Sequence, residues 1–310
     1  MAYPTAQGYP AYSGTFIPEI WSGQLIKKFY ETTILSLISN TKYEGEISGH
    51  GDKVIIRTVP TMVIRDYVVG NPLTYERPTT SLVELLIDKG KYFGFEVNDV
   101  MAYQSDLGLL ELFSNAASEQ MKIEIDRMVL GSIAPDAHPK NRGATAGRIS
   151  GNINLGAIAG AGVAITKDNI LRYIIKAASC LDEQNIPATD RFLVAPVWFA
   201  ALLKESRLIE ADVMGDDKSV LRSGVIGNID RFKIILSNLL PTIVDTGAKV
   251  CDTIFFGTPE ALCFATQMTK MDTLRSQSSF DDLVRGLQVY GFKVVQPECL
   301  GYIFGYESTS

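Results

Sequence analysis

The chain has 310 residues, of which 46% are hydrophobic and 21% are charged, values that suit one large globular domain or two closely packed ones. Its formal net charge of −6 argues against a protein whose main task is gripping nucleic acid, because that task needs a basic face to neutralise phosphates. No basic segment precedes an apolar stretch at the N-terminus, and the longest apolar run, residues 155–165, is shorter than the roughly 20 residues that cross a bilayer. We therefore expect neither a secretion signal nor a membrane span.

The N-terminal third is predicted to be extended. Residues 1–18 carry no charge and are rich in Tyr, Pro and Gly, which favours either a disordered tail or an arm that docks on a neighbouring molecule. Helical spacing follows in residues 19–39. Strand patterns then cover residues 52–69 before a turn-rich tip at 71–78, and residues 81–88 and 92–97 after it. This β excursion is too thin to bury both of its faces, so we expect it to lie on something else, such as another subunit.

The longest helical pattern covers residues 106–133, with polar residues along one side, Asp126 among them, and a wide apolar face opposite. About 28 residues at 1.5 Å per residue span roughly 42 Å, which is typical of a scaffold element. Further along, helices are expected at 166–184 and 197–204, the second opened by a proline, with a buried strand at 191–195 between them.

A glycine-containing stretch at residues 222–241 reads RSGVIGNIDRFKIILSNLLP. Gly224 and Gly227 are three residues apart near Arg231, which raises the possibility of a backbone cradle for phosphate or single-stranded RNA. However, apolar residues separate the glycines, and a strand follows that places Phe232 towards a core. The Asn and Asp before this strand tolerate the left-handed conformation of a turn. We therefore predict a strand, a tight turn and a second strand, with Gly227 bending the backbone.

Strand patterns dominate the remainder of the chain. They occur at residues 253–256, 262–267, 281–290, 292–296 and 300–305. The order of β excursion, long helix and mixed region predicts the α+β class, and no internal repeat is found.

No constellation in the sequence supports catalysis. The two histidines, His50 and His138, are not at metal-ligand spacing, and the four cysteines lack C-x-x-C spacing. Hydrolase-elbow, zinc-protease and Walker motifs are missing, and adjacent carboxylates at 216–217 and 281–282 point apart. We therefore predict no catalytic, cofactor-binding or metal-binding residue, and buried, reduced thiols at all four cysteines.

Several short motifs resemble those of tailed-bacteriophage major capsid proteins, and they occur in the same order. In that family a G-x-I-x-G-F turn joins two strands, and S-N-x-L-P ends the second strand. Residues 224–232 and 237–241 are similar, except that Arg231 stands where glycine is usual. The other similar segments are 95–99 with Gln104 before the long helix, Ile125-Asp126 within it, 170–196 and 284–292.

The resemblance implies the Hong Kong ninety-seven-type (Johnson) fold, an α+β fold with four parts. These are an N-terminal arm (1–45), an extended β loop (46–98), a peripheral domain with the spine helix (99–164 and 299–310) and an axial domain (165–298). The last strand is expected to return to the peripheral sheet.

The resemblance also implies a non-enzymatic major capsid protein. Pentamers and hexamers of the chain would form an icosahedral shell around phage double-stranded DNA, which the inner wall would meet without sequence readout. Other expected partners are a portal protein, optional decoration proteins and a separate scaffolding protein, since no long scaffolding extension fits before the loop near residue 50. The protein would be located in the virion, and in the host cytoplasm during assembly, and it would mature from a rounder procapsid to an expanded shell.

Two alternatives remain open. An encapsulin-like nanocompartment shell has the same fold, but such shells begin with an amphipathic helix rather than an uncharged Tyr/Pro/Gly segment. Nucleic acid rather than enzyme inside purified shells would separate these two functions. A soluble enzyme or RNA-binding module would instead form a small, discrete oligomer.

The structural and assembly candidates come from the axial turn and strand, the extended loop and the spine helix. They are Gly224, Gly227, Arg231, Phe232, Asn238 and Pro241; Lys53, Lys89 and Lys91; and Asp126. The lysines are candidates for a covalent crosslink by location only. Because glycine is usual at its position, Arg231 is a candidate for reaching a neighbouring subunit from a loosened turn.

Overall fold

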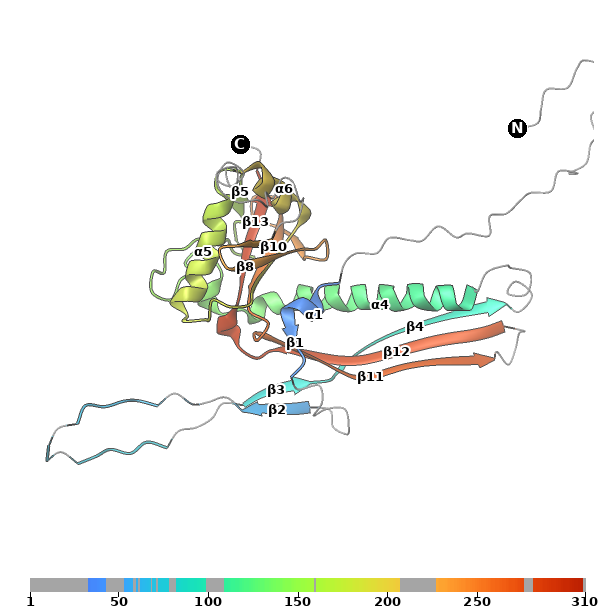
Figure 1. The fold of residues 1–310 in the computed structure, drawn as a ribbon, viewed down its shortest axis with the longest axis horizontal. Helices are drawn as coiled ribbons and strands as arrows, with labels where there is room; N and C mark the ends of the chain where they lie inside the picture. The colour runs from blue at the N-terminus through green and yellow to red at the C-terminus, as the bar shows by residue number, and fades with distance from the viewer. Residues whose placement is uncertain are drawn as a thin grey trace, which may run out of the picture.

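The computed structural model describes residues 33–42, 53–57, 60, 62–67, 69–70, 72–77, 82–98, 109–158, 160–206, 227–275 and 281–308. These ranges form two large sheets, a long helix and a projecting two-stranded ribbon (Figure 1). None of the helices in the described ranges has the length and hydrophobicity of a membrane span.

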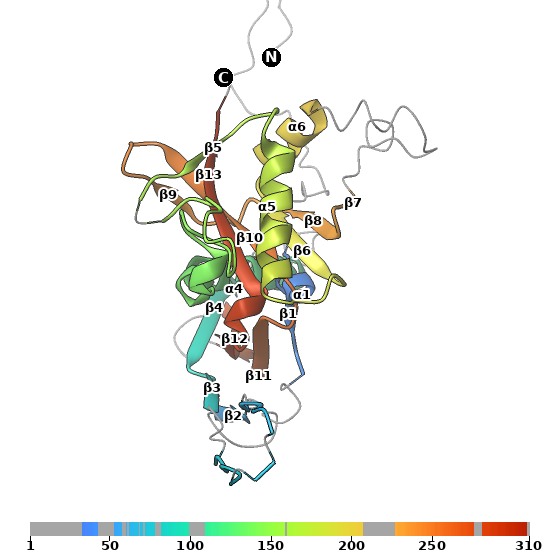
Figure 2. The ribbon, with the colours of Figure 1, turned by 90° about the vertical axis from the view of Figure 1, so that its left-hand side faces the viewer.

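The larger sheet has seven strands and lies at the C-terminal end of the molecule. In spatial order its strands are β5 (Val163–Ile165), β13 (Leu300–Glu307), β10 (Val250–Gly257), β6 (Arg191–Ala195), β8 (Phe232–Leu236) and β7 (Asn228–Ile229), with β9 (Thr242–Val244) paired to β10. The central β6 is buried at all five positions, as expected of an apolar strand that is covered on both faces. Figure 2 shows α5 (Ile170–Glu183) lying across the sheet, with α6 (Val197–Glu205) above it.

The second sheet has four strands and runs alongside the long helix α4 (Leu109–Ile133) (Figure 1). Its order is β1 (Ser39–Asn40), β11 (Leu262–Arg275), β12 (Asp281–Val294) and β4 (Lys89–Asn98). Alternate residues of β4 face the helix, so that the Phe95 ring meets the Phe113 ring edge-on at 6.0 Å. The short helix α1 (Leu35–Ile38) leads into β1, and three single 3₁₀ turns complete the described elements: η1 (Ala134–Asp136), η2 (Pro139–Asn141) and η3 (Pro297–Cys299).

The two-stranded ribbon consists of β2 (Lys53–Arg57) and β3 (Leu82–Leu86), which pair antiparallel. Near its base, one face packs on the four-stranded sheet through a small apolar cluster that includes Ile56, Leu85, Ile87, Cys263 and Ala265. A side chain at Gly291 of β12 would collide with the Leu86 carbonyl oxygen, so glycine permits this close approach. The excursion therefore does lie on another element, as its thinness predicted, but at its base that element belongs to the same chain.

The pairing of four strands differs from the predicted domain boundaries. The hairpin of β11 and β12, expected in the axial domain, pairs with β4 beside the long helix. Because β4 pairs with β12, β4 belongs to the four-stranded sheet, although residues 46–98 were predicted to form the extended loop. The prediction that the last strand returns to the sheet of the long helix is wrong, because β13 pairs with β10 and β5 in the seven-stranded sheet. Strand periodicity is a local signal, and it carries no information about the distant partner of a strand.

The helix predicted from residue 166 begins at Ile170, because the Thr166 N–H is held by the Asn169 side chain at 2.8 Å in the turn before it. Of the helix predicted at 19–39, residues 35–38 form α1, and residues 19–32 lie outside the described part. Residues 62–67 carry no strand pairing. All four cysteines are free and buried, as predicted.

Candidate functional site

The turn between β7 and β8 is the element that carried most of the resemblance. Ile229 pairs with Phe232, so only Asp230 and Arg231 form the turn, and both have positive φ angles, 43° and 67°. Positive φ at both central residues is the type I′ pattern of a two-residue hairpin. The turn is therefore tight, as predicted, and the glycine usual at position 231 has a conformational reason. Gly227 lies before this hairpin rather than in its turn, and its φ is not in the left-handed range that favours glycine.

Arg231 is held by an acidic residue of its own chain. Its Nη2 lies 2.9 Å from Oδ2 of Asp182, near the end of α5, and its Nη1 donates to Oδ1 at 3.3 Å. This two-point contact between guanidinium and carboxylate offsets part of the conformational free energy that the left-handed backbone of Arg231 costs. The hypothesis that a loosened turn lets Arg231 reach a neighbouring subunit is not supported, because the turn is tight and the guanidinium is paired internally.

Asp182 also binds a second, buried arginine. Nη2 of Arg191 donates to Oδ1 of Asp182 at 2.7 Å, and the same guanidinium donates to the backbone carbonyls of Ile186 and Pro187 at 2.6 and 2.9 Å. The Arg191 side chain is fully buried. Burial by itself would raise the pKa of Asp182, but the hydrogen bonds and charges of Arg231 and Arg191 outweigh it and lower that pKa. Asp182 therefore ties the end of α5 to both β6 and the β7–β8 turn.

Neither Asp182 nor Arg191 was among the site residues predicted from the sequence. The available signal was an arginine at the start of an otherwise apolar strand, RFLVA, because a buried arginine needs an acidic partner. Spacing did not identify which carboxylate that partner would be.

The remaining residues of this stretch have mostly structural positions. Phe232 is completely buried and meets Phe256 edge-on, with the ring centroids 6.3 Å apart. The carbonyl of Pro241 accepts the N–H of Thr253 at 3.1 Å. Asn238 is exposed, and Gly224 lies outside the described residues.

The structure does not bring the three candidate lysines together. Lys53 pairs with Glu84 across the ribbon at 3.4 Å, whereas the other two lie on β4 in the four-stranded sheet. Lys89 pairs with Asp88 at 3.1 Å, and Lys91 pairs with Glu124 of α4 at 3.3 Å. No residue type or contact in the described chain marks any of them as a crosslinking lysine.

Asp126 is not on the solvent side of α4, where its spacing placed it. It is 4% exposed, and its Oδ2 accepts the N–H of Ile34 at 2.7 Å and of Leu35 at 3.2 Å. Burial raises its pKa, against the two backbone hydrogen bonds, which lower it. Helical periodicity could not reveal this, because the N-terminal segment that covers Asp126 is distant in sequence.

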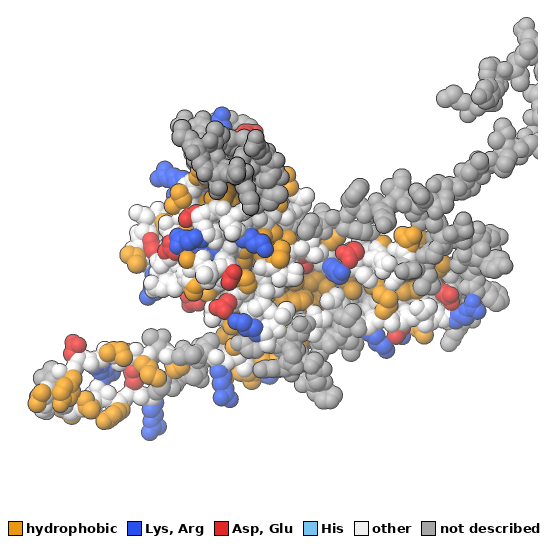
Figure 3. All heavy atoms as spheres, viewed as in Figure 1, with side chains coloured by type: hydrophobic (Ala, Val, Ile, Leu, Met, Phe, Trp, Pro, Cys, Tyr) orange, Lys and Arg blue, Asp and Glu red, His pale blue; other side chains and the backbone are white. Residues whose placement is uncertain are grey.

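The tip of the ribbon carries an unusual amount of exposed apolar surface. Ile64 is 92% exposed and Tyr75 is 89% exposed, and hydrophobic side chains lie along both arms of the tip (Figure 3). The other large apolar side chains exposed there are Met62, Val63, Tyr67, Val69 and Leu73. A contiguous apolar surface of this kind indicates a surface for another molecule.

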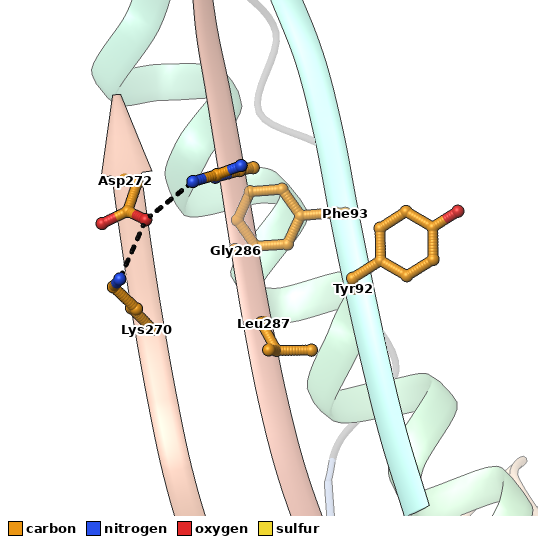
Figure 4. Close-up of a pocket in the computed structure, with 7 residues that line it drawn as sticks. Tyr92, Phe93, Lys270, Asp272, Gly286 and Leu287 are labelled. Carbon is orange, nitrogen blue, oxygen red and sulfur yellow. Dashed lines mark hydrogen bonds and ion pairs between the residues drawn. The ribbon is translucent and has the colours of Figure 1, made fainter. Parts of the chain in front are cut away.

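A shallow hollow opens on the four-stranded sheet. There the Phe93 ring lies against Gly286, where any side chain would collide with the ring, while Tyr92 points away (Figure 4). Asp272 pairs with Lys270 and Arg285, both at 3.3 Å. The hollow has a volume of about 520 Å³ and is lined by Tyr92, Phe93, Lys270, Asp272, Arg285, Gly286 and Leu287. Its aromatic and aliphatic walls with a few paired charges suit a protein surface better than a reacting substrate.

Nothing in the described residues suggests a metal centre. No group of three or more His, Cys, Asp or Glu side chains is close enough there to hold a metal ion. His138 instead accepts the N–H of Lys140 at 3.2 Å and contacts the Gln184 amide at 3.0 Å, and His50 lies outside the described part.

Comparison with known proteins identifies the family to which this chain is similar. The family model described as "Phage capsid protein" matches residues 83–303. Among solved structures, one of Mycobacterium phage Che8 aligns with a TM-score of 0.76 at 29% identity, covering 94% of this chain and 98% of that one. The capsid structure of Cyanophage P-SCSP1u aligns with a TM-score of 0.72 at 15% identity over 94% of both chains. The asymmetric unit of the bacteriophage PhiM1 mature capsid gives 0.67 at 15% identity, with 94% and 92% covered. No match is found among curated proteins.

Proposed function

The chain belongs to the phage capsid protein family as a major capsid protein of the tailed-phage icosahedral shell, and we propose that it assembles there as pentamers and hexamers. The seven-stranded sheet with α5 and α6 would serve as the axial domain around each ring. Closed rings of one chain need heterologous contacts, in which two different surfaces of the subunit meet. The role is structural, without enzymatic activity.

The division into domains follows the sheets rather than the predicted boundaries. In this proposal the peripheral domain consists of α4 with β4, β11 and β12, and the axial domain includes β13. The ribbon with its tip is the extended loop, and the segment before residue 45 is the N-terminal arm. Ring and lattice contacts would then come from different parts of the subunit.

The exposed apolar tip is the observation that carries the lattice proposal. Side chains such as Ile64 and Tyr75 find no burial within the described chain, so a neighbouring subunit would supply it. At about 25 cal/mol per Å² of apolar area, even a small loop repeated over every subunit adds up to substantial assembly free energy. The extended loop would therefore lace neighbouring subunits together.

Further partners follow from the same function. We expect a separate scaffolding protein during assembly and a portal protein, with decoration proteins as an option. Packaged double-stranded DNA would lie inside without sequence readout, and a net charge of −6 is consistent with a wall that does not immobilise it. Expression with and without a candidate scaffolding protein tests the first of these. Efficient, uniform shells from this chain alone would exclude that requirement.

The tip is tested by replacing both Ile64 and Tyr75 with serine in the full chain. We expect shell yield, measured by sedimentation and electron microscopy, to fall at least tenfold, because the neighbour loses its apolar contact. The control is Ile149→Ser, which removes another highly exposed isoleucine, 82% accessible, from outside the tip. If the tip variant assembles as well as the control, the lacing role is excluded.

A further inference from the structure

Residues 33–42 lie where the two sheets meet (Figures 1 and 2). Ile34, Leu35 and Ile38 are buried in one apolar cluster with side chains from α4 and from both sheets. The next two residues form β1 and pair in parallel with the start of β11, Ser39 opposite Leu262. This short segment therefore packs against both halves of the subunit.

A single carboxylate of α4 fixes the start of this segment. Oδ2 of Asp126 accepts the N–H groups of both Ile34, the residue that precedes α1, and Leu35, its first residue; N–H groups at a helix start have no partner within the helix. Asp126 is buried and forms no ion pair with the described residues. Loss of this acceptor would leave two donors without a partner in a buried site.

The end of the segment is tied to the connection between the sheets. Residues 258–261 link β10 of the seven-stranded sheet to β11 of the four-stranded sheet. Nδ2 of Asn40 donates to the Pro259 carbonyl at 3.1 Å, and Lys42 pairs with Glu260 at 3.0 Å. The segment thus binds α4 at one end and the interdomain link at the other.

We propose that residues 33–42 act as a clasp that fixes the angle between the long-helix unit and the seven-stranded sheet, with Asp126 as the group that holds the clasp closed. The chain also passes between these units at residues 134–162, 258–261 and 295–299, and backbone hydrogen bonds such as Thr258 N–H to the Cys299 carbonyl join the connecting segments. Beside these connections the units share an apolar cluster, and apolar packing is less directional than the hydrogen bonds of residues 33–42. The angle sets the shape that each subunit presents to its neighbours. The inference concerns the single subunit and stands whether or not the proposed rings form.

The test measures that angle in the full-length, unassembled subunit. Asn115→Cys on the outer half of α4 and Arg172→Cys on α5 provide two exposed sites for spin labels, since the four native cysteines are buried. Pulsed electron spin resonance then reports the distribution of distances between the labels. The same background receives Asp126→Ala, Asp126→Asn or, as a control, Glu119→Ala, which removes an exposed carboxylate of the same helix.

We expect Asp126→Ala to broaden or shift the distance distribution. Amide hydrogen exchange at Ile34 and Leu35 should also become roughly tenfold faster or more. Asp126→Asn keeps an oxygen acceptor and should show the wild-type distance distribution and amide exchange. Glu119→Ala should leave both measurements unchanged. A destabilised fold alone would not be rescued selectively in this way.

The proposal is overturned if Asp126→Ala frees the amides of the segment and yet keeps the wild-type distance distribution. If that variant does not fold, Asn40→Ala is the substitute, because it removes only the hydrogen bond to the Pro259 carbonyl at the other end of the segment. It should broaden the distribution to a smaller extent. An unchanged distribution with faster amide exchange there would equally overturn the clasp.

Discussion

The seven-stranded sheet and the β2–β3 ribbon are both built from apolar, β-branched sequence, but they bury it differently. β6 is buried at all five positions, between clusters on the two faces of its sheet. The ribbon buries one face at its base and exposes Ile64 and Tyr75 at its tip. Apolar side chains in the sheet therefore stabilise the subunit, whereas those of the tip are available to stabilise an assembly.

The largest effect on subunit stability is expected for Phe232→Ala in the sheet. The ring is fully buried against Phe256, so its removal leaves a cavity and should lower the free energy of unfolding by about 3–5 kcal/mol. Urea denaturation of the unassembled subunit measures this, with Phe232→Leu as the smaller-cavity control. A loss below about 1 kcal/mol would mean that the sheet core is looser than its burial indicates.

Arg191→Leu should have the next largest effect. It removes the donors of the Ile186 and Pro187 carbonyls and one of the two partners of Asp182, at a cost of about 3 kcal/mol. Arg191→Lys keeps the charge but not the planar fork, so it should recover part of the loss. Equal stability of the Leu and Lys variants would show that hydrogen-bond geometry does not matter here.

At the junction of the regions, Asp126 should make stability depend on pH. Because burial raises its pKa above the ordinary value of 3.8, the folded state binds the proton more tightly than the unfolded state. The contribution of this group to stability is therefore complete below the unfolded pKa and declines as pH rises through the folded pKa. Asp126→Asn should remove that decline in urea midpoints measured between about pH 3 and pH 7. A decline of the same size in the Asn variant would assign it to another group.

Smaller changes are expected at the edge of the sheet, at Arg231. Arg231→Gly loses the exposed pair with Asp182 but relieves the positive φ, so stability should stay within about 1 kcal/mol. Arg231→Ala loses the pair and keeps the unfavourable conformation, so it should be about 1 kcal/mol less stable than the Gly variant. Denaturation of the three proteins side by side gives the order, and an Ala variant as stable as the Gly variant would contradict the turn geometry.

The tip should show the smallest effect on the subunit itself. Replacing Ile64 and Tyr75 together with serine should change the free energy of unfolding by no more than about 0.5 kcal/mol, because both side chains are exposed. Thermal unfolding of the unassembled protein is the measurement. A clear loss of stability would show that the tip packs on its own subunit.

The sequence alone specified the features that depend on neighbours along the chain. It located the long helix, the buried strand at 191–195, the helix opened by Pro196 and the tight turn before Phe232. Helix and strand periods, proline at a helix start and turn residues act over a few positions, so they can be recognised without a structure. The order of motifs was enough to indicate the capsid family.

The three-dimensional packing of the chain was needed to establish which strands share a sheet and which polar residues are buried. β13 and the β11–β12 hairpin exchanged their expected sheets, because pairing between distant segments depends on the packing of the whole chain. Helical spacing places Asp126 on the polar side of its helix, yet it is buried beneath residues 33–42. Arg231 is paired with Asp182, which lies on a helix far away in the sequence. These contacts join residues at least 49 positions apart, a separation over which no local pattern specifies a partner.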